Sequence, residues 1–172
     1  METIRVFTVG GTIDKIYFDA NSSYEVGPPN IARILVDLQL NPQFEVTSLM
    51  QKDSLDMTDS DRALIRAQVS SAAETRILIT HGTDTMVETA KALMAGAVNQ
   101  GKTVVLTGAL SPALFKNSDA MFNIGGAVIA VQTLPPGCYI AMNGQVFTAD
   151  KVRKDSAANR FVAYQTDTNS QM

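Results

Sequence analysis

The stretch that decides the fold is R-I-L-I-T-H-G-T-D-T-M, residues 76–86. It opens on an apolar run of strand length, residues 76–80, which stops at a threonine and the only histidine. The apolar residues beyond it recur at helical spacing: Val87, Ala90, Met94, Ala97 and Val98. Thr85 and Glu88 have the S/T-x-x-E form of a capping box, which predicts a helix that begins at about Thr85. Thr83 and Asp84 are therefore predicted to lie in a turn between a strand and a helix.

Two interpretations of this turn stay open. The carboxyl end of a strand in an open α/β sheet is the edge where ligands bind, and a hydroxyl beside a carboxylate suits a small polar substrate. Thr83 and Asp84 also suit a purely structural role, in which they satisfy free backbone amides at the start of the helix. The turn alone does not separate the two.

The same alternation of strand and helix runs along the chain and predicts the fold class. We expect an α/β fold with an open, mainly parallel sheet and helices on both faces, a three-layer arrangement like that of flavodoxin or Rossmann domains. Residues 1–164 are predicted to form a single domain, and residues 165–172 a polar, mobile tail. Polar or glycine-rich turns follow four predicted strands, so they should meet along one edge of the sheet: Gly10-Gly11-Thr12, Asp53-Ser54, Gly82-Thr83-Asp84 and Thr107-Gly108.

Composition and charge exclude several kinds of partner. The net charge is −3 over 172 residues and no basic run occurs, which argues against nucleic acid. No apolar run approaches the ~18 residues of a membrane span. One cysteine, Cys138, and one histidine, His81, argue against a disulfide framework and against a metal site. The start of the chain enters a strand without a signal-peptide core, so we expect a cytoplasmic protein.

Residues 96–103, G-A-V-N-Q-G-K-T, match the letters of a phosphate-binding P-loop. That loop requires a strand before it and a helix after it, whereas here a predicted helix precedes the segment and a predicted strand follows it. We therefore expect no nucleotide binding. Lys102 is left at the start of a buried strand, where a lysine that extends its ammonium to solvent is the simpler explanation.

The predicted edge is rich in hydroxyl groups, from Thr12, Ser54, Thr83 and Tyr24. Hydroxyls near one carboxylate and one amine suit acyl transfer, in which a threonine attacks an amide carbonyl and forms an ester. Backbone amides of the loops would hold the oxyanion of that step.

Several segments together resemble the bacterial-type L-asparaginases. Residues 10–13, G-G-T-I, resemble the family's first motif, and residues 81–86, H-G-T-D-T-M, match its second motif. Residues 53–57, D-S-L-D-M, are similar to its D-S-x-x-M segment, and residues 24–27, Y-E-V-G, to its Y-x-V-G loop. Lys102 resembles the lysine that precedes the family's V-V-x-x-G-A strand.

The resemblance implies hydrolysis of L-asparagine to L-aspartate and ammonia, without a cofactor or metal. Thr12 would be the nucleophile with Tyr24 as its support, and Thr83, Asp84 and Lys102 would form a second catalytic triad. Ser54 would bind the substrate carboxylate and Asp84 its ammonium, with Gly11, Asp53 and Thr83 completing the substrate site. His81 would keep a structural role.

The chain also departs from the family. Only the amino-terminal domain of the usual two is similar, and residues 108–112, G-A-L-S-P, lack the arginine of the family's G-A-M-R-P. A short enzyme and a piece of a longer one both fit this pattern. The alternative function is a non-catalytic amino-acid-binding or assembly module on the same fold. A lone domain with an open edge predicts a homo-oligomer, a dimer or tetramer, that closes the site.

Overall fold

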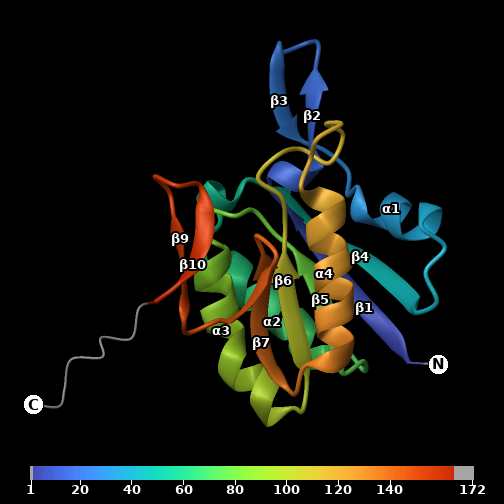
Figure 1. Cartoon of the computed structure of the whole chain (residues 1–172), viewed down its shortest axis with the longest axis vertical. Helices are drawn as coiled ribbons and strands as arrows, with labels where there is room; N and C mark the ends of the chain where they lie inside the picture. Colours follow the sequence, from blue (N-terminus) through green and yellow to red (C-terminus); the bar gives the residue numbers. More distant parts are fainter. Residues whose placement is uncertain (1, 165–172) are drawn as a thin grey trace, which may run out of the picture.

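A computed structural model describes residues 2–164 and consists of a central sheet covered by helices on both faces (Figure 1). Six strands follow the order β4-β1-β5-β6-β7-β8. Their bounds are Gln43–Lys52 (β4), Thr3–Gly10 (β1), Arg76–Thr80 (β5), Thr103–Thr107 (β6), Gly137–Met142 (β7) and Gln145–Thr148 (β8). All neighbours in the first five pair in parallel, and only β8 runs antiparallel to β7. The predicted α/β class with a mainly parallel sheet is confirmed.

Two apolar layers hold the helices on the sheet. Helices α1 (Ile31–Asp37) and α4 (Ala120–Thr133) pack on one face with Leu78 and Val105, while α2 (Asp59–Ser71) and α3 (Met86–Asn99) pack on the other with Ile77 and Ile79. Successive residues of β5 thus alternate between the two cores, as the pleat of a strand requires. The result is the predicted three-layer arrangement in a single domain.

Three pairs of antiparallel strands complete the fold. Strands β2 (Lys15–Phe18) and β3 (Ser23–Val26) form a hairpin that projects beyond the end of the sheet at the top of Figure 1. Asn143 and Gly144 join β7 to β8 with φ angles of 54° and 72°, as a two-residue hairpin turn requires. Strands β9 (Val152–Asp155) and β10 (Arg160–Ala163) form a separate pair to which the sequence patterns assigned no structure.

Helix α3 begins at Met86 with Thr85 as its N-cap residue, where the sequence placed its start. The predicted capping box is wrong, because the Thr85 side chain makes no cap hydrogen bond. Its hydroxyl donates instead to the carbonyl oxygen of Ser54 over 2.8 Å and ties the β5–α3 turn to the turn after β4.

In the described part of the chain, no helix combines the length and apolar character needed to cross a membrane. The polar tail predicted for residues 165–172 lies outside the described residues.

Candidate active site

Three loops meet at the carboxyl ends of β1, β4 and β5, and glycines allow them to touch. Gly11, with φ of 94°, lies against Gly82, and a Cβ atom at Gly11 would collide with the Cα and N atoms of Gly82. A Cβ at Gly82 would in turn lie 2.6 Å from Cβ and 2.7 Å from Oγ of Ser54. Both positions therefore require glycine, since any side chain would push the loops apart. The segments that carry Thr12, Ser54 and Thr83 are brought together as expected.

Thr12 lies directly after Gly11 as the first residue of a 3-10 turn, η1 (Thr12–Asp14). Its side chain is half-buried. The backbone N–H of Asp14 donates to the Gly11 carbonyl oxygen over 3.1 Å and closes this turn. Thr12 is thus held at the edge of the sheet next to the Gly82 loop.

The turn after β4 is a second 3-10 element, η2 (Ser54–Asp56), with Asp53 as its N-cap residue. Ser54 is buried, and the Asp53 carboxylate accepts the Leu55 N–H over 3.1 Å and pairs with the Lys15 ammonium over 3.0 Å. Burial alone would raise the Asp53 pKa, but the Leu55 hydrogen bond and Lys15 outweigh it and lower this pKa below its ordinary value. Asp53 is therefore a fixed negative charge at the site.

The turn after β5 holds a hydroxyl, a carboxylate and an amine in direct contact. The Lys154 Nζ atom lies 2.8 Å from Thr83 Oγ1 and 2.6 Å from Asp84 Oδ1. Thr83 is buried, the Lys154 side chain is 12% exposed and that of Asp84 is 43% exposed. The ammonium thus neutralises Asp84 on one side and donates to the threonine hydroxyl on the other, while Asp84 keeps a face toward solvent.

The structure overturns the assignment of Lys102 to this group. Lys102 precedes β6, and a five-residue parallel strand spans about 17 Å, so it lies at the opposite edge of the sheet. Its buried ammonium donates to the carbonyl oxygens of Val69 over 2.6 Å, Ser70 over 3.3 Å and Ala72 over 2.5 Å. These are free acceptors at the carboxyl end of α2, where a cation is favoured. Burial lowers the Lys102 pKa, and Glu74 partly opposes that effect.

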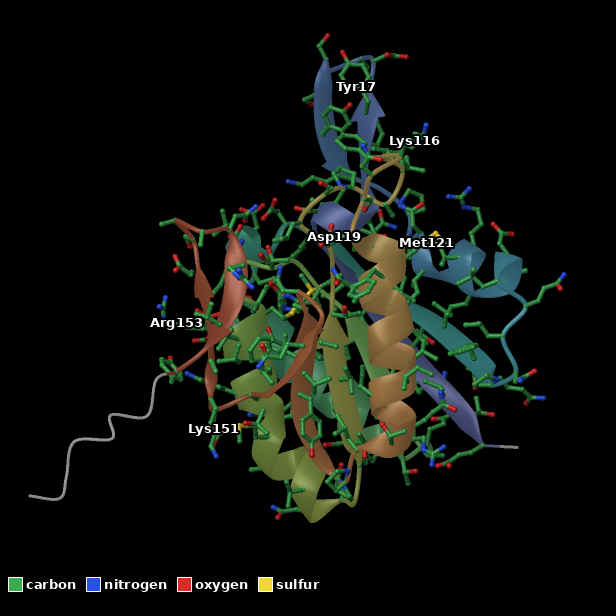
Figure 2. The ribbon with its side chains drawn as sticks, in the orientation of Figure 1. Tyr17, Lys116, Asp119, Met121, Lys151 and Arg153 are labelled. Carbon is green, nitrogen blue, oxygen red and sulfur yellow. The ribbon has the colours of Figure 1, made fainter. Side chains whose placement is uncertain are left out.

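The sequence patterns missed Lys154, which lies on β9, a strand outside the six-stranded sheet. In Figure 2 the chain rises from Lys151 past Arg153 toward the end of the sheet that carries the site. One signal could have helped. A lysine needed at the carboxyl edge cannot stand at the start of a parallel strand, so Lys102 was excluded by the predicted topology itself. The basic residues outside the sheet are then the remaining candidates for the amine.

Tyr24 is on the β2–β3 hairpin and is 51% exposed. Its ring packs edge-on against Tyr17 at 5.3 Å and Phe115 at 5.6 Å between ring centroids. Within residues 2–164 no hydrogen bond joins Tyr24 to Thr12, so the expected support of Thr12 is not formed in this arrangement. Tyr24 instead lines a polar hollow of about 510 Å³ together with Lys15 and Asp53.

His81 is fully buried and has a structural role, as expected. Its Nδ1 atom lies 2.7 Å from the Gly82 carbonyl oxygen and its Nε2 atom 2.8 Å from Thr89 Oγ1. The carbonyl accepts only, which assigns the ring proton to Nδ1. Burial lowers the His81 pKa to about 4, so the ring is neutral and fixes the backbone between Gly82 and Thr83.

The arrangement offers the Thr12 hydroxyl on a loop next to Gly82, the Thr83 hydroxyl in contact with an amine, and the Asp84 carboxylate open to solvent. This set is suited to transfer of an acyl group from an amide. Among residues 2–164, no three histidine, cysteine or acidic side chains cluster as metal ligands would.

Comparisons with known proteins agree with this geometry. The family profile described as Asparaginase, N-terminal, matches residues 3–171. A protein named "Probable L-asparaginase periplasmic" from Haemophilus influenzae is 30% identical over 91% of this chain and 47% of its own length. A component of the glutamyl-tRNA(Gln) amidotransferase from Aeropyrum pernix is 32% identical over 78% of this chain and 33% of its own. The solved thermostable L-asparaginase from Thermococcus kodakarensis superimposes with a TM-score of 0.83 at 27% identity, over 94% of this chain and 51% of that one. The chain thus spans about half the length of these asparaginases.

Proposed function

The chain belongs to the asparaginase family through its amino-terminal domain, and on this premise we propose that it hydrolyses L-asparagine to L-aspartate and ammonia. The observation that carries the proposal is the contact of the Lys154 ammonium with both Thr83 Oγ1 and Asp84 Oδ1, beside the loop that holds Thr12. A turn-capping role for Thr83 and Asp84 would require neither the amine nor the glycine contacts.

In the first step the Thr12 hydroxyl oxygen attacks the side-chain amide carbon of the substrate. Its proton ends on the departing nitrogen, the C–N bond breaks, and ammonia leaves a β-aspartyl ester on Thr12. Backbone amides of the Gly11 and Gly82 loops are the candidate donors to the oxyanion. In the second step a water adds to the ester carbon, and the threonine oxygen leaves with a proton. Lys154 donates a hydrogen bond to Thr83 Oγ1 and fixes the orientation of that hydroxyl for the proton transfers.

The charged groups at the edge suit the ends of a free amino acid. Asp84 exposes a carboxylate face to solvent, which suits the substrate ammonium. Ser54 lies against Gly82, which in turn lies against Gly11, and the Ser54 hydroxyl and turn suit the substrate carboxylate. Asp53 and its partner Lys15 line the polar hollow that Tyr24 also lines. Gly11 is required for the close approach of the two loops that surround the amide.

The direct test is a coupled ammonia assay with L-asparagine and L-glutamine. Thr12→Ala and Lys154→Met should lower turnover by about 100- to 10,000-fold, as loss of a nucleophile or of a group that assists proton transfer does. Lys151→Met is the matched control, because Lys151 is an exposed lysine just before the same strand. Full activity in Thr12→Ala or in Lys154→Met, with both variants folded by circular dichroism, would refute the mechanism.

A second candidate is a non-catalytic module that binds an amino acid or assembles with another protein. Two findings favour it: the chain spans about half the length of its asparaginase relatives, and one relative is named as part of an amidotransferase. Calorimetric binding of L-aspartate by wild type that releases no ammonia would support this candidate against the first.

We also propose that the chain forms a homo-oligomer through the outer face of α4. This helix has no charged residue, and Phe122, Ile129 and Met121 are 70%, 63% and 54% exposed around an apolar hollow of about 600 Å³. Gly125 and Gly126 lie midway between Phe122 and Ile129 and leave open space above the helix. A twofold axis at the glycine pair would set Phe122 of one copy against Ile129 of the other, a self-complementary contact.

Light scattering tests this assembly at micromolar concentration. Wild type should be a dimer or a tetramer, and Phe122→Glu should shift it to the monomer, with Lys116→Glu on the neighbouring loop as the control. A monomeric wild type would contradict the proposal.

The cytoplasmic location stays a prediction, since relatives are named both periplasmic, as in Haemophilus influenzae, and cytoplasmic, as in Campylobacter jejuni.

A further inference from the structure

Three buried side-chain polar atoms in residues 2–164 lack a hydrogen-bond partner: Thr8 Oγ1, Thr80 Oγ1 and Asp14 Oδ2. Thr8 and Thr80 pair in register near the ends of β1 and β5, and Asp14 follows in the turn after β1. These three atoms therefore lie near the carboxyl ends of β1 and β5, where the loops that carry Thr12 and Thr83 begin. Unsatisfied buried polar atoms are rare and require an explanation, and a carboxyl is the most costly of these three to bury.

The Asp14 side chain is 1% exposed and has no cation as partner among the described residues. The lysine next to it in sequence, Lys15, pairs with Asp53 instead. Burial raises the Asp14 pKa to about 6, although hydrogen bonds from Asn30 act in the opposite direction. An apolar residue would fill this position at a lower cost, so the carboxyl must contribute something specific to the turn.

That contribution is visible in the hydrogen bonds of the turn. Asp14 Oδ1 accepts the backbone N–H of Asn30 over 2.8 Å, while the Asp14 N–H donates to Gly11 and closes the turn around Thr12. The Asp14 carbonyl oxygen also accepts the Gly27 N–H over 2.9 Å, at the base of the β2–β3 hairpin. One residue therefore fastens the Thr12 turn to both the end of the hairpin and the start of α1.

A neighbouring loop is attached at the same place. The Ile13 carbonyl oxygen accepts the Ala113 N–H over 3.0 Å and the Asn30 side-chain amide over 3.3 Å. Figure 2 shows this loop, which carries Lys116, below the hairpin residue Tyr17, and the Tyr24–Phe115 ring contact joins the two. The orientation of Thr12 thus depends on a junction of four segments, and Asp14 supplies the only carboxylate in these contacts.

We propose that Asp14 is a positioning residue for Thr12, which fixes the nucleophile's turn through its carboxyl contact with Asn30. The inference rests on the proposed function. Asp14 is not a general base for Thr12, because side chains two residues apart in a helical turn do not face each other. A displacement of about 1 Å in a reacting group lowers rates by as much as 100-fold, and this sets the expected effect of a loosened turn.

The test compares Asp14→Ala, which loses the acceptor, with Asp14→Asn, which keeps an oxygen in its place. Asp14→Ala should lower kcat by about 10- to 100-fold with KM changed less than twofold, and Asp14→Asn should restore kcat to within about threefold of wild type. Thr8→Val is the matched control: it removes another buried polar atom without a partner, from strand β1 and not from the Thr12 turn, and should leave kcat unchanged. Equal kcat in Asp14→Ala and wild type, or an equal loss in Asp14→Ala and Asp14→Asn, would overturn the proposal.

Hydrogen–deuterium exchange separates this inference from the proposed function. Amides of residues 12–30 should exchange at least tenfold faster in Asp14→Ala than in wild type, and at the wild-type rate in Asp14→Asn. If wild type released no ammonia, the proposed function would fall while this measurement still decided whether Asp14 holds the turn. Unchanged exchange in Asp14→Ala would then refute its role.

Discussion

Two buried groups make the stability of this protein depend on pH in opposite directions, and Asp14→Asn should separate them. The folded-state pKa of Asp14 is raised from 3.8 to about 6, so its contribution to stability is fully present below pH 3.8 and is lost as pH rises through about 6. The folded-state pKa of His81 is lowered from 6.5 to about 4, so its contribution is present above pH 6.5 and is lost as pH falls through about 4.

The two effects have similar size. Each pH unit between the folded and unfolded pKa values corresponds to about 1.4 kcal/mol, which gives about 3 kcal/mol for Asp14 and about 3 kcal/mol for His81. Between pH 4 and pH 6.5 the loss from one group offsets the gain from the other. The free energy of unfolding of wild type should therefore be nearly constant over this range, as far as these two groups decide it.

Asp14→Asn removes one of the two effects and leaves the other. The variant should match wild type near pH 4 and should be about 3 kcal/mol more stable at pH 7, because it carries no buried charge there. Its free energy of unfolding should then fall by about 3 kcal/mol as pH decreases from 6.5 to 4, through His81 alone.

Urea denaturation of both proteins at pH 4, 5, 6 and 7, followed by far-ultraviolet circular dichroism, measures these free energies. The slope m should be the same for the two proteins, which shows that the unfolded states are comparable. Parallel stability curves for Asp14→Asn and wild type across this range would refute the reasoning, because Asp14 would then titrate alike in the folded and unfolded chains.

Three further predictions follow from single positions. Lys102→Met should lower the free energy of unfolding by about 3 kcal/mol and Tm by roughly 6 to 12 °C, because it leaves the last carbonyls of α2 without a partner. The kcat of this variant at 25 °C should stay unchanged. An inactive but stable variant would contradict this prediction. Gly82→Ala should abolish ammonia release, because the added Cβ meets Ser54 at 2.6 Å, and activity above a tenth of wild type would show that the loops can separate. Cys138 should resist a thiol reagent at pH 8 until the protein is unfolded, because burial raises its pKa to about 12, and rapid labelling of the native protein would contradict this.

Much of the fold could be predicted because its determinants are local. The apolar run before His81 and the helical spacing after Thr85 define a strand and a helix within one short stretch, and strand–helix alternation then requires parallel pairing. The Asn143-Gly144 turn is local in the same sense, because two residues with positive φ determine a hairpin by themselves. The predicted capping box at Thr85 was wrong because the Thr85 hydroxyl donates to the Ser54 carbonyl oxygen, an acceptor far away in the sequence.

The amine of the site could not be found in the same way. Strand β9 is four residues long, V-R-K-D, and such a segment shows no period that separates it from a loop. Its approach to Thr83 depends on how the chain returns beyond β8, which is set by tertiary packing and not by local pattern. The burial of Asp14 could not be predicted from local pattern either. Its hydrogen-bond partners Asn30 and Gly27 lie 16 and 13 residues further along the chain, beyond the β2–β3 hairpin.

The two lysines differ in which edge of the sheet they reach, and this decides which of them can contact the site. Lys102 stands beside a buried strand and Lys154 lies on a short outer one, yet Lys154 contacts the Thr83 hydroxyl and Lys102 caps a helix. Parallel strands place all their carboxyl ends on one edge, so a residue that begins such a strand is a full strand length from the chemistry. An amine can therefore join the hydroxyls only from a segment that returns to this edge, and β9 is that segment. The chemistry we propose depends on the closing β9–β10 pair as much as on the turns that first indicated it.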